Sequence, residues 1–220
     1  MSDPLVQLKG VSRRFEERLA LRPVDLALKA GGCVALVGEN GSGKSTLLRI
    51  ACGRDAPTTG TALFDGAPVR EDDPAVRARV AVVADAPAFY PDLTVREHLL
   101  LVAVSHGVGD DAEAWVDWAL EDRRLTDHRD ARPSTLSSGQ VQAMLLASAL
   151  VRPRDLLVLD EPEQRLDPGA RERLAERLLA ERADGVAVLL ATHSADLASA
   201  VADSVIVLDE GRVVSRGKPA

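Results

Sequence analysis

The sequence predicts an α/β fold with a parallel central sheet, an N-terminal antiparallel β part and a helical subdomain. Three short runs of almost uniformly apolar residues indicate the parallel sheet, because strands buried on both faces have this composition. These runs are Val34–Val37, Leu156–Leu159 and Val186–Ala191. A glycine-rich turn follows the first run and two carboxylates follow the second. Sheets of this kind bind ligands beyond the carboxyl ends of their strands, so a site is expected there.

The outer strands are expected in two places. Residues 1–80 are predicted to form the antiparallel β part together with the first strand and helix of the core. Asp65 and Gly66 are a turn signal within this part, and Glu210 and Gly211 lie in the turn of a hairpin near the C-terminus. The strands that flank these turns are Val6–Val11, Thr61–Phe64, Val205–Leu208 and Val213–Val214.

A mainly helical insert is predicted for roughly residues 85–150. It contains the expected helices Val95–His106 and Ala112–Leu120 and ends in a further apolar helix. Trp115 and Trp118 lie three residues apart, and we expect both to pack in the small core of this insert.

The chain is expected to be a single domain, because 220 residues are enough to bury a sizeable core. Residues 1–84 and 151–220 would form its core lobe, and residues 85–150 its helical subdomain. A surface helix is predicted over residues 171–182. Its apolar face carries Leu174, Leu178 and Leu179.

The glycine-rich turn reads Gly-Glu-Asn-Gly-Ser-Gly-Lys-Ser-Thr and fits the phosphate-binding P-loop pattern between a strand and a helix. Its backbone N–H groups and the helix N-terminus favour an anion. Lys44 is expected to reach the β- and γ-phosphates, Ser45 to ligate Mg²⁺, and Thr46 to contact the α-phosphate. The fold is therefore predicted to have a P-loop NTPase core. The predicted nucleotide contacts are Gly38, Glu39, Asn40, Gly41, Ser42, Gly43, Lys44, Ser45 and Thr46.

Two carboxylates, Asp160 and Glu161, follow the second apolar run. A P-loop site needs an acidic residue for Mg²⁺, and Asp160 fits that role. Glu161 is the expected general base, which orients and polarises the water that attacks the γ-phosphorus.

Residues 136–140 read Leu-Ser-Ser-Gly-Gln, which resembles the signature of ATP-binding-cassette (ABC) ATPases. The order of motifs resembles this family from Leu5 to Gly217. The resemblance implies a dimer that closes around two ATP molecules. It also implies that Ser137, Gly139 and Gln140 contact the nucleotide bound by the facing subunit.

Further motifs belong to the same resemblance. His193, which follows the third apolar run, would contact the γ-phosphate and link it to Glu161. Leu166 and Asp167 resemble the D-loop, which crosses the dimer interface. Phe15 resembles the aromatic residue that stacks on adenine, although a core aromatic is the alternative interpretation.

Three departures from the family pattern stand out. Asp85 occupies the place of the usual Gln, and we expect it near the metal with altered hydrolysis or coupling. The usual arginines of the helix after the signature are absent, which is compatible with a more buried helix or with a weaker composite site. Residues 163–165 replace small residues and are expected to favour a particular partner subunit. The residues in place of the arginines are Val141, Ala143 and Ser148.

Composition limits the partners and the compartment. A net charge of −7 argues against a dominant nucleic-acid surface. No apolar run approaches the roughly 20 residues of a membrane span. We therefore expect a cytoplasmic protein that is peripheral on the cell membrane. Cys33 and Cys52 are expected to be buried free thiols.

The function predicted from the resemblance is the ATP-hydrolysing subunit of an ABC transporter. A separate membrane subunit would be its partner, together with a second ATPase subunit, identical or not. Export is favoured because residues 93–99 and the short chain look like those of exporters. Two alternatives remain open: a soluble ABC ATPase outside transport, and a poorly hydrolysing, regulatory half of a heterodimer.

Overall fold

The parallel sheet is the centre of the molecule. The computed structural model describes residues 3–84 and 89–219. Six strands lie in the order β10-β9-β3-β8-β7-β6, and all neighbours are parallel except β10 and β9, which form the C-terminal hairpin. Their bounds are β3 (Cys33–Val37), β6 (Val80–Val83), β7 (Leu156–Asp160), β8 (Ala187–Ala191), β9 (Ser204–Asp209) and β10 (Arg212–Gly217).

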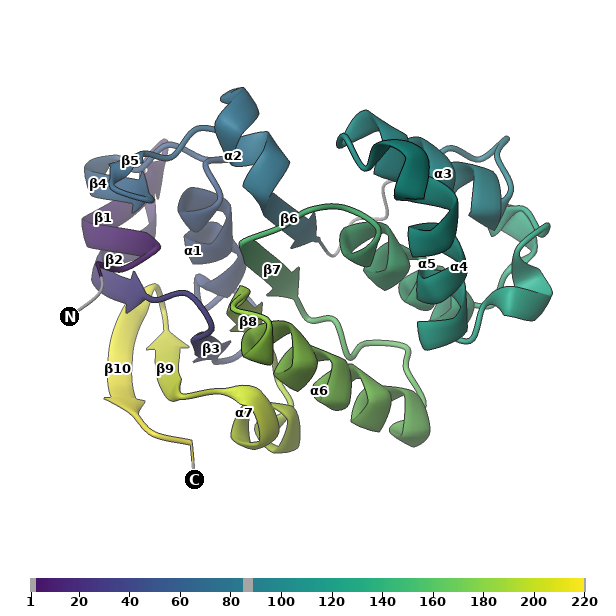
Figure 1. The fold of residues 1–220 in the computed structure, drawn as a ribbon. Coiled ribbons are helices and arrows are strands. Elements are labelled where there is room, and N and C mark those ends of the chain that lie inside the picture. Colours follow the sequence, from purple (N-terminus) through teal and green to yellow (C-terminus); the bar gives the residue numbers. More distant parts are fainter. Residues whose placement is uncertain (1–2, 85–88, 220) are drawn as a thin grey trace.

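A second sheet is antiparallel and lies beside the first (Figure 1). Its order is β2-β1-β4-β5. Helix α1 (Lys44–Ala51) packs between the sheets, because its apolar side chains join strand residues of both in one core. Both predicted turns are confirmed by the hairpins β4–β5 and β9–β10. The strands are β1 (Val6–Phe15), β2 (Arg18–Leu28), β4 (Thr59–Phe64) and β5 (Ala67–Pro68), and the short helix α2 (Pro74–Arg79) follows.

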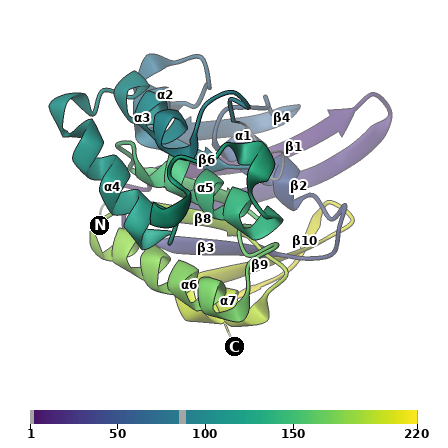
Figure 2. The ribbon, with the colours of Figure 1, turned by 90° about the vertical axis from the view of Figure 1, so that its right-hand side faces the viewer.

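The other face of the parallel sheet is covered by α6 (Pro168–Ala183) and α7 (Ala195–Val201), opposite α1 (Figure 2). Leu174 and Leu178 are buried against this face, as predicted. The prediction for Leu179 is wrong, because that side chain is 45% exposed.

Three helices form the helical subdomain at the side of the core lobe (Figure 1). A third core joins them and contains neither tryptophan. The prediction for the tryptophans is therefore wrong: Trp118 is exposed, and the guanidinium carbon of Arg177 lies 4.9 Å from its ring centroid. Arg177 also donates to Asp122 at 2.7 Å, which joins α6 to α4. The elements are α3 (Val95–Ser105), α4 (Ala112–Asp122) and α5 (Ser138–Leu150), with 3₁₀ turns η1 (Gly109–Asp111), η2 (Thr126–His128) and η3 (Pro133–Thr135).

The burial of helix α5, the helix that follows the signature, accounts for its missing arginines. Leu145 and Leu146 face the sheet core, whereas Met144 and Ala147 face the helical core. The helix is thus buried on two sides. Ser148 remains polar because its hydroxyl bonds His98 at 3.1 Å and the Met144 carbonyl at 2.9 Å.

The cysteines are free and buried, as predicted. Burial raises the pKa of the Cys33 thiol to about 12. Within the described residues, no helix combines the length and apolar character needed to cross a membrane.

Glu181 is expected to matter for stability, because it is a buried carboxylate that accepts two bonds from Arg154, at 2.6 and 2.7 Å. Glu181→Gln removes its charge and leaves that of Arg154 largely uncompensated, so the free energy of unfolding should fall by about 2–4 kcal/mol. Urea unfolding at neutral pH measures this loss. The matched control is Glu176→Gln, an exposed residue of the same helix. Equal effects of the two substitutions would contradict the expectation.

Candidate functional site

The P-loop connects β3 to α1, as predicted. Gly38 approaches another strand so closely that a Cβ there would lie 2.1 Å from the Leu208 carbonyl oxygen. Gly43 caps α1 with φ 103°, a left-handed conformation that favours glycine. These two positions therefore allow the tight turn that places the first N–H groups of α1 at its open end.

Lys44 is the first residue of α1, and its side chain turns back over the loop. Its ammonium donates to the Gly38 carbonyl at 2.7 Å and to the Glu39 carbonyl at 3.0 Å. The same nitrogen lies 3.7 Å from a carboxylate oxygen of Glu161 and 3.4 Å from Nε2 of His193. A buried cation is thus held at the mouth of the loop beside an acid and an imidazole.

Glu161 and His193 come from neighbouring strands. The N–H of Glu161 donates to the Ala191 carbonyl at 2.9 Å, and Glu161 adopts φ 50° as the chain leaves β7. Its carboxylate lies 2.6 Å from Nε2 of His193, which is also 3.0 Å from Oδ1 of Asn40. A proton on Nε2 satisfies both oxygens. The structure therefore brings together Lys44, Glu161 and His193, three residues predicted from separate motifs.

A cavity of about 410 Å³ opens beside this cluster. Phe15 lies at its edge and is 43% exposed, so it is not a core residue. The guanidinium carbon of Arg13 lies 4.5 Å from the centre of its ring. Arg18 also lines the cavity, which sequence analysis missed because it belongs to no motif. The lining residues are Phe15, Arg18, Ala20, Asn40, Gly41, Gly43, Lys44, Ser45, Thr46 and Glu161.

Oxygen ligands suited to Mg²⁺ occur at two element ends. The hydroxyl of Ser45 lies in the first turn of α1, and the carboxylate of Asp160 ends β7. Their chemistry fits the ion. In the described part of the chain, no group of three His, Cys, Asp or Glu residues forms a ready-made metal cluster. Asp85, the third predicted metal residue, lies outside the described residues.

The signature residues begin helix α5 in the helical subdomain (Figure 1). The Ser137 hydroxyl accepts from the N–H of Gln140 at 3.3 Å, and the side chain of Gln140 accepts from the N–H of Ser137 at 2.8 Å. Gln140 also bonds His128 at 2.7 Å. A Cβ on Gly139 would lie 2.9 Å from the Arg165 carbonyl, so the chain just before Leu166 passes directly over the helix start.

Glu163 makes hydrogen bonds within the chain that the sequence did not predict. We expected its charge to face a partner, but the side chain is buried. Oε1 accepts from the hydroxyl of Thr192 and from the N–H of His193, the latter at 3.2 Å. Glu163 therefore fixes the backbone that carries His193. Gln164 and Arg165 remain exposed.

Removing the carboxylate of Glu163 should loosen this connection. Glu163→Ala leaves the buried hydroxyl of Thr192 and the N–H of His193 without this acceptor, so the free energy of unfolding should fall by about 1–3 kcal/mol. Glu163→Gln keeps an acceptor at Oε1 and should lose less. Chemical denaturation compares both with Glu172→Ala, an exposed residue of α6. A Glu163→Ala variant as stable as this control would refute the role.

Three comparisons place this geometry among known proteins. The sequence profile of the ABC transporter family matches residues 21–164. The Nod factor export ATP-binding protein I of Burkholderia lata is 37% identical over 215 residues, 97% of this chain and 71% of that protein. The solved structure of an ATP-binding subunit of an ABC transporter matches with a TM-score of 0.89 and 31% identity, over 97% of this chain and 90% of that one.

A second solved structure concerns ATP hydrolysis. It is a dimeric ATP-binding cassette in a post-hydrolysis state with ADP and Pi, and it matches with a TM-score of 0.88 and 27% identity. The match covers 98% of this chain and 99% of the other. From the family profile, the relatives and the P-loop cluster together, the chain belongs to the ABC transporter family and is an ATP-binding cassette that hydrolyses ATP.

Proposed function

We propose that this ATP-binding subunit dimerises around two Mg-ATP molecules and drives a separate membrane subunit in export. The observation that carries the proposal is the mutual contact of Lys44, Glu161 and His193 beside one cavity, while the signature lies in the other lobe. Within one chain, the P-loop cluster and the signature are thus separate, and each would be half of a nucleotide site. Two chains related by a twofold axis can complete both sites.

The hydrolytic step follows from the positions of these side chains. Lys44 exchanges its two carbonyl acceptors for phosphate oxygens. Glu161 holds a water for attack on the γ-phosphorus and accepts its proton. His193 keeps the Glu161 carboxylate in place, and its Nε2–H exchanges the Asn40 oxygen for the γ-phosphate. Ser45 and Asp160 would hold Mg²⁺, which neutralises charge on the phosphates when bound.

The facing subunit supplies the start of its own α5. The first N–H groups of a helix favour an anion, and Ser137 and Gly139 lie at that end. Their contact with a γ-phosphate across the interface favours the closed dimer while ATP is intact. Hydrolysis removes the bridging phosphate, so the halves separate. The dimeric relative with ADP and Pi supports this cycle.

The similarity to a named export protein supports a peripheral exporter subunit. The relative from Burkholderia lata has export in its name, and the match covers 97% of this chain and 71% of that protein. The membrane subunit is proposed to bind around residues 85–105, a range that includes α3. The protein would then lie on the cytoplasmic face of the cell membrane.

The ATP-dependent dimer can be tested with Glu161→Gln. Losing the base should reduce turnover by about 100-fold or more and trap the closed state. Light scattering should then show a doubling of mass with Mg-ATP. Lys44→Ala, which cannot hold the phosphates in the same way, should remain monomeric. A Glu161→Gln variant that binds ATP and stays monomeric would contradict self-pairing.

Phe15 is expected to stack on the adenine. Phe15→Ala should weaken ATP binding by about tenfold, because stacking on an aromatic ring contributes about 1–3 kcal/mol per base. Equilibrium titration with ATP measures this loss. Tyr90→Ala, which removes an exposed aromatic of the other lobe, is the control. Equal affinity of Phe15→Ala and the wild type would exclude stacking at this position.

A further inference from the structure

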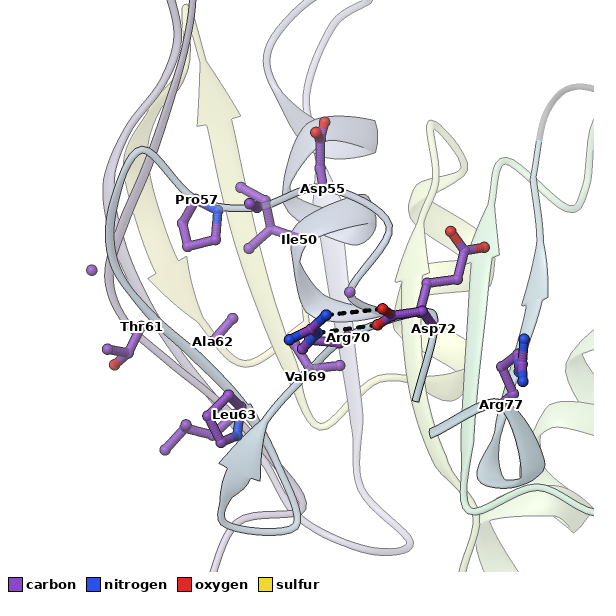
Figure 3. Close-up of a pocket in the computed structure, with 15 residues that line it drawn as sticks. Ile50, Asp55, Pro57, Thr61, Ala62, Leu63, Val69, Arg70, Asp72 and Arg77 are labelled. Carbon is purple, nitrogen blue, oxygen red and sulfur yellow. Dashed lines mark hydrogen bonds and ion pairs between the residues drawn. The ribbon is translucent and has the colours of Figure 1, made fainter. Parts of the chain in front are cut away.

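Two of the cavities outside the nucleotide site differ in their charges. The larger one, about 820 Å³, lies between the end of α1 and the hairpin β4–β5 (Figure 3). Its charges compensate one another: Arg70 pairs with Asp72 at 2.9 Å, and Asp55 pairs with Arg13 at 2.9 Å. Arg77 lies apart from the Arg70–Asp72 pair (Figure 3). This larger cavity therefore carries little uncompensated charge.

The smaller cavity, about 210 Å³, shares Arg77 with the larger one and is positively charged. Its only acid, Glu71, is paired with Arg54 at 2.9 Å. Among residues 3–84 and 89–219, neither Arg77 nor Arg152 forms an ion pair with a carboxylate. The cavity is lined by Cys52, Arg54, Glu71, Val76, Arg77, Val80, Val82, His106 and Arg152.

Two backbone carbonyls hold the guanidinium of Arg152, but its Nε–H has no acceptor among the described residues. Its Nη2 donates to the carbonyls of Arg77 and Val80, the latter at 3.0 Å. Its Nε–H is buried and has no hydrogen-bond acceptor among the described residues. Burial, together with the charges of Arg154 and Arg54, lowers the pKa of the Arg152 guanidinium to about 10. A half-buried cation held by backbone carbonyls alone is unfavourable, and an anion would stabilise it.

His106 lines the same cavity and lies near the positive charges of Arg77 and Arg152. Its Nδ1 lies 2.8 Å from the Val102 carbonyl, which assigns the proton to that nitrogen. Burial and the charges of Arg152 and Arg77 lower the pKa of the imidazole. The second nitrogen therefore stays without a proton near neutral pH and gains one most readily when a negative charge approaches.

We propose that this cavity binds a small oxyanion of the size of phosphate, held by Arg77, Arg152 and His106. These residues come from three places: Arg77 from α2, His106 from the end of α3, and Arg152 from the segment between α5 and β7. An anion bound to all three joins the core lobe to the helical subdomain. Orthophosphate, which this ATPase itself releases, has the required charge and size.

Arginine side-chain NMR tests the site directly. The Nε–H resonance of Arg152 is assigned with Arg152→Lys, and chloride is replaced by phosphate at constant ionic strength. We expect a saturable shift of this resonance. Arg77→Gln should raise the apparent Kd about tenfold, the loss expected for one charge-assisted hydrogen bond. Arg22→Gln, an exposed arginine of β2, should change it less than about twofold.

The P-loop also binds phosphate, so the titration is repeated with Lys44→Ala. The Arg152 shift should persist there, because Lys44 does not line this cavity. A shift that never saturates, or that Lys44→Ala abolishes, would overturn the proposal. Saturation by acetate but not by phosphate would overturn it as well, since the cavity would then accept a single carboxylate.

Discussion

The register of the parallel sheet is the constraint on which the nucleotide site depends. Leu36 of β3 and Asp160 of β7 both pair with Ala191 of β8, so three strands end at one level. The bond from the Glu161 N–H to the Ala191 carbonyl continues this row beyond the last pair. A slip of one residue would turn every side chain of a strand to the other face. The P-loop, Glu161 and His193 would then no longer meet.

Buried carboxylates maintain this arrangement where the backbone alone would not. Glu163 holds the turn after β8, and Glu181 holds the segment before β7 through Arg154. Both act on the strands that carry His193 and Glu161. A charge at such a position is stable only while its partners are present. The site is therefore coupled to the stability of the core lobe, and not only to its own side chains.

The sequence was most informative where backbone requirements are strict. The apolar runs and the glycine-rich turn allow few alternatives, and all three predicted inner strands are present. Side-chain directions on helices were less predictable, because they depend on which neighbour covers each face. Trp118 faces Arg177 of α6 instead of the helical core, and Glu163 turns inward to Thr192. The hydrophobic periodicity of the sequence does not indicate either side-chain direction, because the contacting residue lies 59 residues away from Trp118 and 29 residues away from Glu163.

The two lobes meet through charges as well as apolar contacts, and this has a consequence for motion. Asp122 and Arg177 connect α4 to α6 at one side of the boundary through an ion pair of 2.7 Å. Arg152 and Arg77 lie at another boundary, where the positive charge is not matched. A rotation of the helical subdomain relative to the core lobe must change the distances between the charged side chains at both boundaries. Because the contact at the first boundary is an ion pair within the chain, an anion at the second is the contact whose presence can vary. Occupancy of that small cavity would thus bias how far the signature can move toward a facing nucleotide.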